Sequence, residues 1–306
     1  MDIVMNVNFT HRFQNGTVTV IEREPELIFN KEVTYYVLLI NTWGLGQGVT
    51  CLGLIVNILN IIIFIRQGFK ESVNVSLFSL TISDLGSLVF LFFLNLCWIP
   101  AVGKLDLPFY PDQMIYFLFY GHVMFTRVTT GTTAWIAMER CLCIITPLKV
   151  KSLITGRRTV VFVCVLYLIS TASCAPLLYT SRFRWIFDAF RNKTLLGLVK
   201  IENREKIEGV VYVVNNVMPI TFFIVIVGCT VVLSKALLKN AEWRQRTAIQ
   251  KEGTNRDTKV VKLVLIISLV FIFCYAPGSL FFLWVLIDRE MKIDGKQRNF
   301  LIAFFG

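Results

Sequence analysis

The chain has 306 residues, of which 55% are hydrophobic and 17% charged, and its formal net charge is +11. A soluble domain of this length carries more charge and shows amphipathic periods, so the composition argues against a soluble enzyme. The apolar residues instead form runs that are hydrophobic on all sides, which indicates contact with a lipid bilayer. The basic residues fall mostly between these runs, so we expect no nucleic-acid partner.

The first segment, residues 1–35, is a polar tail. It has no basic stretch followed by a short apolar one, so we expect no cleaved signal peptide. Glycosylation sequons begin at Asn8 and Asn15 in this tail, and a third begins at Asn192 in a later loop. We expect all three on one side of the membrane, which predicts an extracellular tail.

Six apolar runs follow, with predicted helices over residues 36–65, 73–99, 112–141, 157–180, 209–239 and 255–287. About 20 apolar residues cross the hydrocarbon core, and a backbone in lipid must satisfy its own hydrogen bonds, so each run is predicted to be a helix. A further apolar start at residues 299–306 has no end. The prediction is an all-α membrane protein, a seven-transmembrane helix bundle with six complete helices and a truncated seventh. Residues 36–306 form this one domain, incomplete at its C-terminus.

The orientation of the bundle follows from its first three helices. Lysine and arginine divide evenly between the two predicted sides, so their total does not decide. Arg66, Lys70 and the basic loop after the third helix lie on one side, which is predicted to be cytosolic. Together with the sequons, this predicts a multi-pass plasma-membrane protein with its N-terminus outside.

Polar residues inside the predicted helices need a reason, because an ionisable group in a membrane is costly. Asn57 lies in the middle of the first helix and Asp84 in the middle of the second, so the two could meet inside the bundle. Either they form a static hydrogen bond between helices or they belong to a hydrated network that rearranges. Glu139 and Arg140, at the inner end of the third helix, could clamp one state and release Arg140 in another.

Two prolines complete the pattern. Pro219 and Pro277 fall inside the fifth and sixth helices, where proline makes a kink that can act as a hinge. In order and depth, the chain resembles the rhodopsin-like family of G-protein-coupled receptors through the following residues: Gly53, Asn57, Leu80, Asp84, Glu139, Arg140, Cys141, Pro147, Pro219 and 271–277. The run 138–143 with 147–151 is similar to invertebrate chemosensory receptors of this family.

The resemblance implies a receptor that binds an extracellular ligand in the outer half of the bundle. It implies that Glu139 and Arg140 couple to a heterotrimeric G protein. Asp257 lies 20 residues before Pro277, about 30 Å along a helix, where the family places the resting partner of Arg140. Breaking that contact would let the sixth helix swing outward.

Two further sets of residues receive roles from the resemblance. A packing switch below the ligand pocket is implied for Pro219, Thr130 and Phe271. A pocket for water or a sodium ion is implied at Asp84, with Asn57 and Thr129. No other cofactor is expected.

The chain departs from the family at several positions. Ile115 stands where the family has a helix-three cysteine, and residues 181–208 contain no cysteine, so the usual disulfide is absent. Cys97 and Cys174 remain open as substitutes. The Asn-Pro-x-x-Tyr motif of the seventh helix is missing, as in a partial sequence or a defective product.

The candidate ligand-binding residues are His122, Arg127, Trp98, Asn215, Asn216 and Tyr275, the last standing where the family has a tryptophan. His122 lies 18 residues before Arg140, five whole turns, so the two share a face of the helix. Arg127 has two interpretations, a structural cation paired elsewhere or a counter-charge for an anionic ligand. The ligand class therefore stays open between a peptide and a small, anionic molecule.

Other functional classes fit the sequence poorly. His11 and His122 are the only histidines, and neither a zinc-protease motif nor a phosphate-binding loop occurs. A transporter or channel would need rows of polar residues on several helices or broken helices at the midplane. The polar residues here are single, so the sequence predicts a receptor and not an enzyme.

Overall fold

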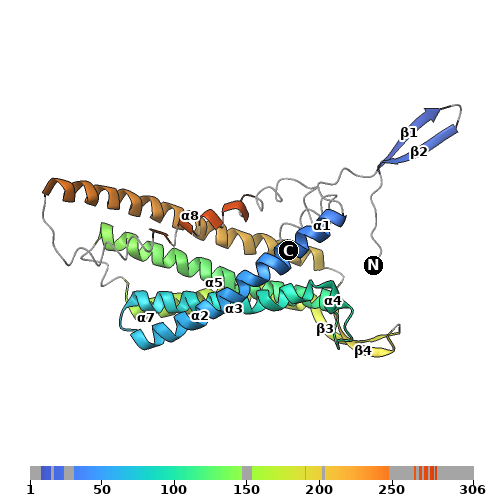
Figure 1. Ribbon diagram of the computed structural model, residues 1–306, viewed down its shortest axis with the longest axis horizontal. Helices are drawn as coiled ribbons and strands as arrows, with labels where there is room; N and C mark the ends of the chain where they lie inside the picture. The colour runs from blue at the N-terminus through green and yellow to red at the C-terminus, as the bar shows by residue number, and fades with distance from the viewer. Residues whose placement is uncertain are drawn as a thin grey trace. The chain divides into compact units, whose positions relative to one another are not determined.

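The computed structural model describes residues 8–14, 17–23, 31–146, 154–189, 191–201 and 204–247, with helical pieces at 265–266, 269–270, 272–274, 276–278 and 280. This part of the chain is mostly helical, as predicted (Figure 1). It divides into two compact units, one of residues 1–44 with 280–306 and the other of residues 45–279.

A β-hairpin occupies the tail that the sequence analysis treated only as polar. Strand β1 (Asn8–Gln14) pairs antiparallel with β2 (Thr17–Arg23). The residues between them in the sequence, Asn15 and Gly16, are a pair typical of two-residue hairpin turns. β2 is rich in β-branched residues, which favour strands. These two signals could have predicted the hairpin.

The first predicted helix is continuous but not uniform. It begins with α1 (Lys31–Leu38), passes through a π-helix, η1 (Leu39–Gly46), and continues as α2 (Gln47–Gln67). It therefore extends beyond the predicted range at both ends. Its backbone bonds still close within the segment, as a lipid environment requires.

The second unit contains the other long helices, which are α3 (Ser72–Cys97), α5 (Pro111–Ile145), α7 (Gly156–Thr180) and α8 (Arg204–Thr247). A single turn, α4 (Pro100–Gly103), lies between α3 and α5. The predicted second, third and fourth helices agree with α3, α5 and α7 to within four residues at either end. α8 is longer than predicted, because charged residues with good helix propensity continue it beyond the apolar run. The described pieces at 265–280 lie in the predicted sixth helix, and residues 299–306 lie outside the described residues.

Four segments of the described chain are long and apolar enough to cross a membrane: Tyr35–Gln67, Ser72–Cys97, Gly156–Thr180 and Val213–Ala236. The third predicted span, α5, is not among them because it carries a dense polar stretch. α5 packs against α3, α7 and α8, and Arg127, Thr130, Thr132 and Thr133 are buried in these contacts. α5 is thus the central helix. Its buried polar residues lie in contacts with neighbouring helices, which explains its lower hydrophobicity.

Glycine lets α3 and α5 approach closely. A Cβ atom at Gly121 of α5 would lie 2.3 Å from the ring of Phe90 in α3. A Cβ atom at Gly86 of α3 would lie 2.5 Å from the ring of Phe125 in α5. The two rings also contact one another, with their centroids 5.8 Å apart. Each helix therefore inserts a phenylalanine over a glycine of the other, as is typical of small residues at membrane helix crossings.

A second hairpin lies between α7 and α8, where the sequence analysis expected a loop over residues 181–208. β3 (Ser181–Asp188) pairs antiparallel with β4 (Lys193–Lys200), and both lie near α4 in Figure 1. Asn192, in the connecting turn, has a φ of 50°, a left-handed conformation that asparagine tolerates better than most residues.

Candidate functional site

A row of polar contacts joins α3 to α5. Nδ1 of His122 lies 2.8 Å from Oγ of Ser87, and Oγ1 of Thr126 lies 3.0 Å from the same oxygen. Thr126 also donates to the carbonyl oxygen of His122, at 2.9 Å. His122 therefore faces α3. Its hydrogen bonds to neighbouring groups offset the free-energy cost of burying a polar side chain.

One turn further along, Asp84 takes part in a second contact between the same helices. Oγ1 of Thr129 lies 2.6 Å from a carboxylate oxygen of Asp84 and 3.1 Å from the hydroxyl of Ser83. The amide of Asn57 donates to the carbonyl oxygen of Gly53 in its own helix, at 2.9 Å. The structure thus brings Asp84 and Thr129 together, whereas the contact described for Asn57 is local.

Arg127 faces a different helix. Its Nη1 donates to Oγ of Ser173 at 3.0 Å and lies 3.6 Å from Sγ of Cys174, both in α7, and the residue is 3% exposed. Five residues separate Arg127 from His122, which rotates the two side chains about 140° apart on a helix. This position against α7 favours the structural interpretation of Arg127 over a counter-charge for a ligand.

Glu139 and Arg140 form an ion pair near the C-terminal end of α5. Nη2 of Arg140 lies 3.7 Å from Oε1 of Glu139, and the side chains are 13% and 7% exposed, respectively. Among the described residues, Nε and Nη2 of Arg140 and Oε2 of Glu139 are buried without a hydrogen-bond partner. The pair therefore has unused capacity to bind another group. Asp257, its expected partner, lies outside the described residues.

The remaining residues predicted to bind a ligand lie at separate places in the fold. Trp98 caps the C-terminal end of α3, where its backbone N–H bonds to Leu94. Asn215, in α8, is 6% exposed, and its Oδ1 has no hydrogen-bond partner in the described part of the chain. Asn216 follows it in the same helix. Tyr275 lies outside the described residues.

The expected switch residues are only partly described. Pro219 is a buried residue inside α8, and Pro277 belongs to the helical piece at 276–278. The hydroxyl of Thr130 donates to the carbonyl oxygen of Thr126 within α5, at 2.9 Å. Phe271 lies outside the described residues, so its contact with the other switch residues stays a prediction.

The β3–β4 hairpin is attached to the start of α5, which the sequence analysis did not predict. The backbone N–H of Leu196 donates to Pro108 at 2.8 Å, and that of Tyr110 donates to Leu196 at 3.3 Å. The side-chain oxygen of Gln113 accepts a hydrogen bond from the backbone N–H of Leu198. Rings of Phe117 and Phe183 meet edge to face, with centroids 6.2 Å apart. These contacts hold β4 against the loop before α5 and against its first turns.

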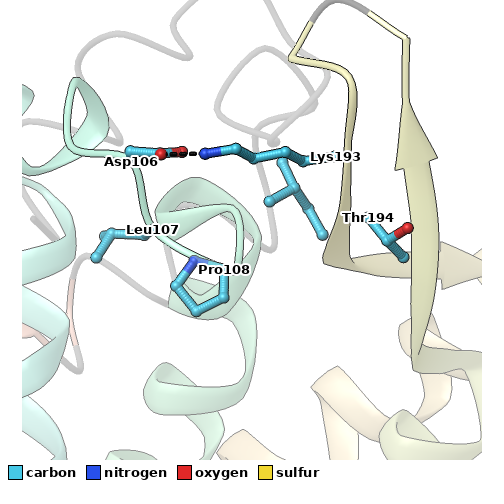
Figure 2. A pocket seen from close by; sticks show the side chains of 6 residues that line it. Asp106, Leu107, Pro108, Lys193 and Thr194 are labelled. Atoms are coloured by element: carbon cyan, nitrogen blue, oxygen red, sulfur yellow. Dashed lines mark hydrogen bonds and ion pairs between the residues drawn. The ribbon is translucent and has the colours of Figure 1, made fainter.

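Polar side chains strengthen the same attachment. Figure 2 shows Asp106, before α5, directed toward Lys193 at the start of β4, with which it forms an ion pair. The hydroxyl of Tyr110 donates to Asp188 at 2.8 Å. The hydrogen bond from Lys193, with its charge, lowers the pKa of Asp106 below its ordinary value. The hydrogen bond to Asp188 raises the pKa of Tyr110 above its ordinary value.

The directions of these pKa shifts define the pH range over which the two contacts stabilise the attachment. Asp106 contributes above the pKa that its carboxyl has in the unfolded chain, and this contribution is lost as the pH falls through its lowered value. Tyr110 contributes below the pKa of its unfolded phenol, and this contribution is lost as the pH rises through its raised value. Both contacts therefore persist throughout the neutral range.

The cysteines form no bond that could fix the hairpin. All eight lie in the described part of the chain and are free thiols, including Cys97 and Cys174, which had remained open as a pair. Cys174 instead contacts Arg127. Noncovalent contacts, such as those of Gln113 and Leu196, therefore attach the hairpin to the start of α5.

Replacing Gln113 with alanine is expected to loosen the hairpin, because the backbone N–H of Leu198 loses its acceptor. A net loss of about 1 kcal/mol raises the local opening equilibrium roughly fivefold. Hydrogen exchange of the Leu198 amide measures this change. Asp112→Ala, at the exposed neighbouring position, is the control and should leave the exchange rate as it is. Equal rates in the two variants would contradict the role given to Gln113.

Comparison with known proteins supports the pattern of the helices. Residues 56–305 match the family model described as "7 transmembrane receptor (rhodopsin family)". The chain is also similar to the Tachykinin-like peptides receptor 86C of Drosophila melanogaster, with 24% identity over 241 residues. That alignment covers 76% of this chain and 45% of the relative, so the chain spans less than half of the relative's length.

Proposed function

Because the chain belongs to the rhodopsin family of seven-transmembrane receptors, we propose that it binds an extracellular ligand and activates a heterotrimeric G protein. It is a membrane receptor and not an enzyme. The ligand enters the outer half of the bundle, and the inner end of α5 contacts the G protein. The family match over residues 56–305 is the observation that carries this proposal.

The Glu139–Arg140 pair supports a switch at the inner end of α5. The two groups are close enough to attract one another, yet their 3.7 Å separation is longer than a hydrogen bond. Buried polar atoms without partners are costly, so the nitrogens of Arg140 that are unpaired among the described residues favour a further hydrogen-bond acceptor. In the resting state that partner is Asp257, and in the active state Arg140 turns to the G protein.

A peptide is the ligand class that we favour. The name of the Drosophila relative gives peptides as its ligands, and at 24% identity this is a guide to class only. Asn215 adds a physical reason, since a buried side-chain carbonyl can accept a hydrogen bond from a peptide N–H. A small anionic ligand would need an accessible cation, and Arg127 faces α7 instead. A chemosensory role is supported by the resemblance of residues 138–143 to invertebrate chemosensory receptors.

Replacing Asn215 with alanine is expected to lower the potency of the peptide about three- to tenfold, because one hydrogen bond to a neutral group contributes about 0.5–1.5 kcal/mol. Val214→Ala is the control, since this neighbour is 53% exposed and lies on a different face of α8 from the buried Asn215. Concentration–response curves at equal surface expression measure the change. Equal potency in the two variants would remove Asn215 from the ligand site.

We place the receptor in the plasma membrane. In the proposed orientation, the tail and the β3–β4 hairpin lie outside the cell. Arg66, Lys70 and the arginines at the start of α7 then lie on the cytoplasmic side of the membrane, in keeping with the positive-inside rule. Asn8, Asn15 and Asn192 become glycosylation sites, and Asn192 is exposed at the tip of its hairpin. Asn15 lies outside the described residues.

Asp84 is a candidate site for a sodium ion or water. Asp84, Thr129 and Ser83 present oxygen atoms within one cluster, and oxygen is the donor type that hard cations prefer. The single carboxylate supplies one negative charge, which suits a monovalent ion. Asn57 would complete the cluster through a shift of its side chain away from Gly53. A sodium-dependent change in ligand affinity that Asp84→Asn removes would support this proposal.

One experiment separates a receptor from its main rival. The protein in lipid nanodiscs is mixed with a purified heterotrimeric G protein and a panel of tachykinin-like peptides, and nucleotide exchange is measured. A peptide-dependent increase that Arg140→Ala abolishes supports the proposed function. Solute flux into proteoliposomes, without exchange on any G protein, would point to a transporter or channel instead.

A further inference from the structure

A shallow groove of about 590 Å³ lies along α7 at its N-terminal end. Its polar end is formed by Thr155, Arg157 and Arg158, and its apolar side by Trp135, Val161, Phe162 and Val165. Both arginine side chains are exposed, and the first turn of α7 holds no acidic residue. None of these residues takes part in the site described above.

The floor of the groove is held by three helices. The rings of Trp135 and Phe162 stack with their centroids 4.3 Å apart and their planes 21° apart. The indole N–H of Trp135 donates to Thr159 at 3.2 Å, and the Thr159 hydroxyl lies 2.8 Å from that of Ser72. Thr159 is fully buried, so α3, α5 and α7 meet at this residue. The aromatic surface is therefore formed before any ligand binds.

The groove opens on an exposed, apolar face of α7. Val161 and Val165 are 56% and 43% exposed, and Leu168 beyond them is 70% exposed. α7 is long and apolar enough to cross a membrane over Gly156–Thr180, which would place the arginines in its first turn at the depth of lipid headgroups.

We propose that this groove binds one anionic phospholipid. The phosphate of its headgroup lies between Arg157 and Arg158, since a guanidinium matches phosphate geometry in two hydrogen bonds. One acyl chain follows Val161 and Val165 across the Trp135–Phe162 stack. The inference uses the proposed orientation, which places the groove in the cytoplasmic leaflet, where anionic lipids are enriched. The combination of a cationic end and an apolar side fits a lipid better than a soluble anion.

Native mass spectrometry of the purified receptor with phosphatidylserine or phosphatidylcholine tests this proposal. The receptor is expected to retain one phosphatidylserine in preference to phosphatidylcholine. The double variant Arg157→Gln with Arg158→Gln should lose about tenfold or more of this retention. Arg66→Gln with Lys70→Gln removes the same charge from the same side of the membrane and should change retention less than twofold.

Two further arms keep the result interpretable. Arg157→Lys with Arg158→Lys preserves the charge but not the paired hydrogen bonds of a guanidinium, so it should retain more lipid than the glutamine variant and less than the wild type, which controls for misfolding. Glycerophosphoserine, the headgroup without acyl chains, should not displace the bound lipid at equal concentration. Equal losses in the glutamine variants of the two pairs, or displacement by glycerophosphoserine, would overturn the proposal. Both readouts are independent of any G protein, so they can fail while the receptor function stands.

Discussion

Replacing Gly121 with alanine is expected to destabilise the receptor by about 1–3 kcal/mol, the usual cost of forcing extra volume into a packed interior. The new Cβ atom would lie 2.3 Å from the ring of Phe90, much closer than van der Waals contact allows. That ring cannot turn freely, because it packs against Phe125, which itself covers Gly86 of the partner helix. α3 and α5 must therefore separate or repack.

The thermal midpoint of the detergent-purified receptor measures this effect. Gly228→Ala is the matched control, because Gly228 lies in α8 with open space around it and alanine favours a helix there. Adding Gly86→Ala to Gly121→Ala should not give a simple sum, since both act on the same pair of rings. If Gly121→Ala melts at the same temperature as Gly228→Ala, the close crossing of α3 and α5 is wrong.

Replacing Glu139 with glutamine is expected to raise signalling in the absence of ligand. The change keeps the size of the side chain but removes the charge that lies 3.7 Å from the Arg140 guanidinium. Because both groups are largely buried, solvent screens their attraction less than at a surface. Couplings of about 1–3 kcal/mol are usual in such switches, so the resting population should fall at least fivefold relative to the active one.

Ligand-independent nucleotide exchange on the G protein reports this shift. Glu71→Gln is a suitable control, because it removes an exposed acid from the turn before α3 and should leave the basal rate unchanged. A basal rate for Glu139→Gln that equals the wild-type rate, at the same surface expression, would show that this pair does not hold the resting state.

The sequence predicted the helices because the thickness of a bilayer fixes the length of each apolar run. α3, α5 and α7 begin and end within four residues of their predicted limits. The same criterion placed the end of α8 too early, since the helix continues to Thr247 through a stretch that contains charged residues such as Lys239 and Arg244. The end of an apolar run marks the expected edge of the bilayer, and a helix can continue beyond that edge.

The two hairpins were missed because their segments were judged by polarity and not by alternation. In parts of β3 and β4, large apolar residues alternate with polar or small ones. This alternation is the period-two pattern typical of strands. The attachment of β4 to α5 could not have been found in this way. Gln113 and Leu198 are 85 residues apart, and nothing local marks them as partners.

Helical geometry gave the relative directions of side chains but not the helices that they face. The separation of His122 from Arg127 predicts different faces, and the contacts with Ser87 and Ser173 identify these faces as those toward α3 and α7. The partners follow from the packing of the bundle, which the order of residues does not specify. The roles of both residues in ligand binding stay predictions.

The switch at the inner end of α5 is the centre of the proposed function, and basal nucleotide exchange tests it most directly. The rate is measured on one G protein for the wild type, Asp257→Ala, Arg140→Ala and the double variant. The account predicts that Asp257→Ala raises the basal rate about fivefold or more and that Arg140→Ala removes this increase. An unchanged rate for Asp257→Ala, or an increase that survives the loss of Arg140, would contradict it.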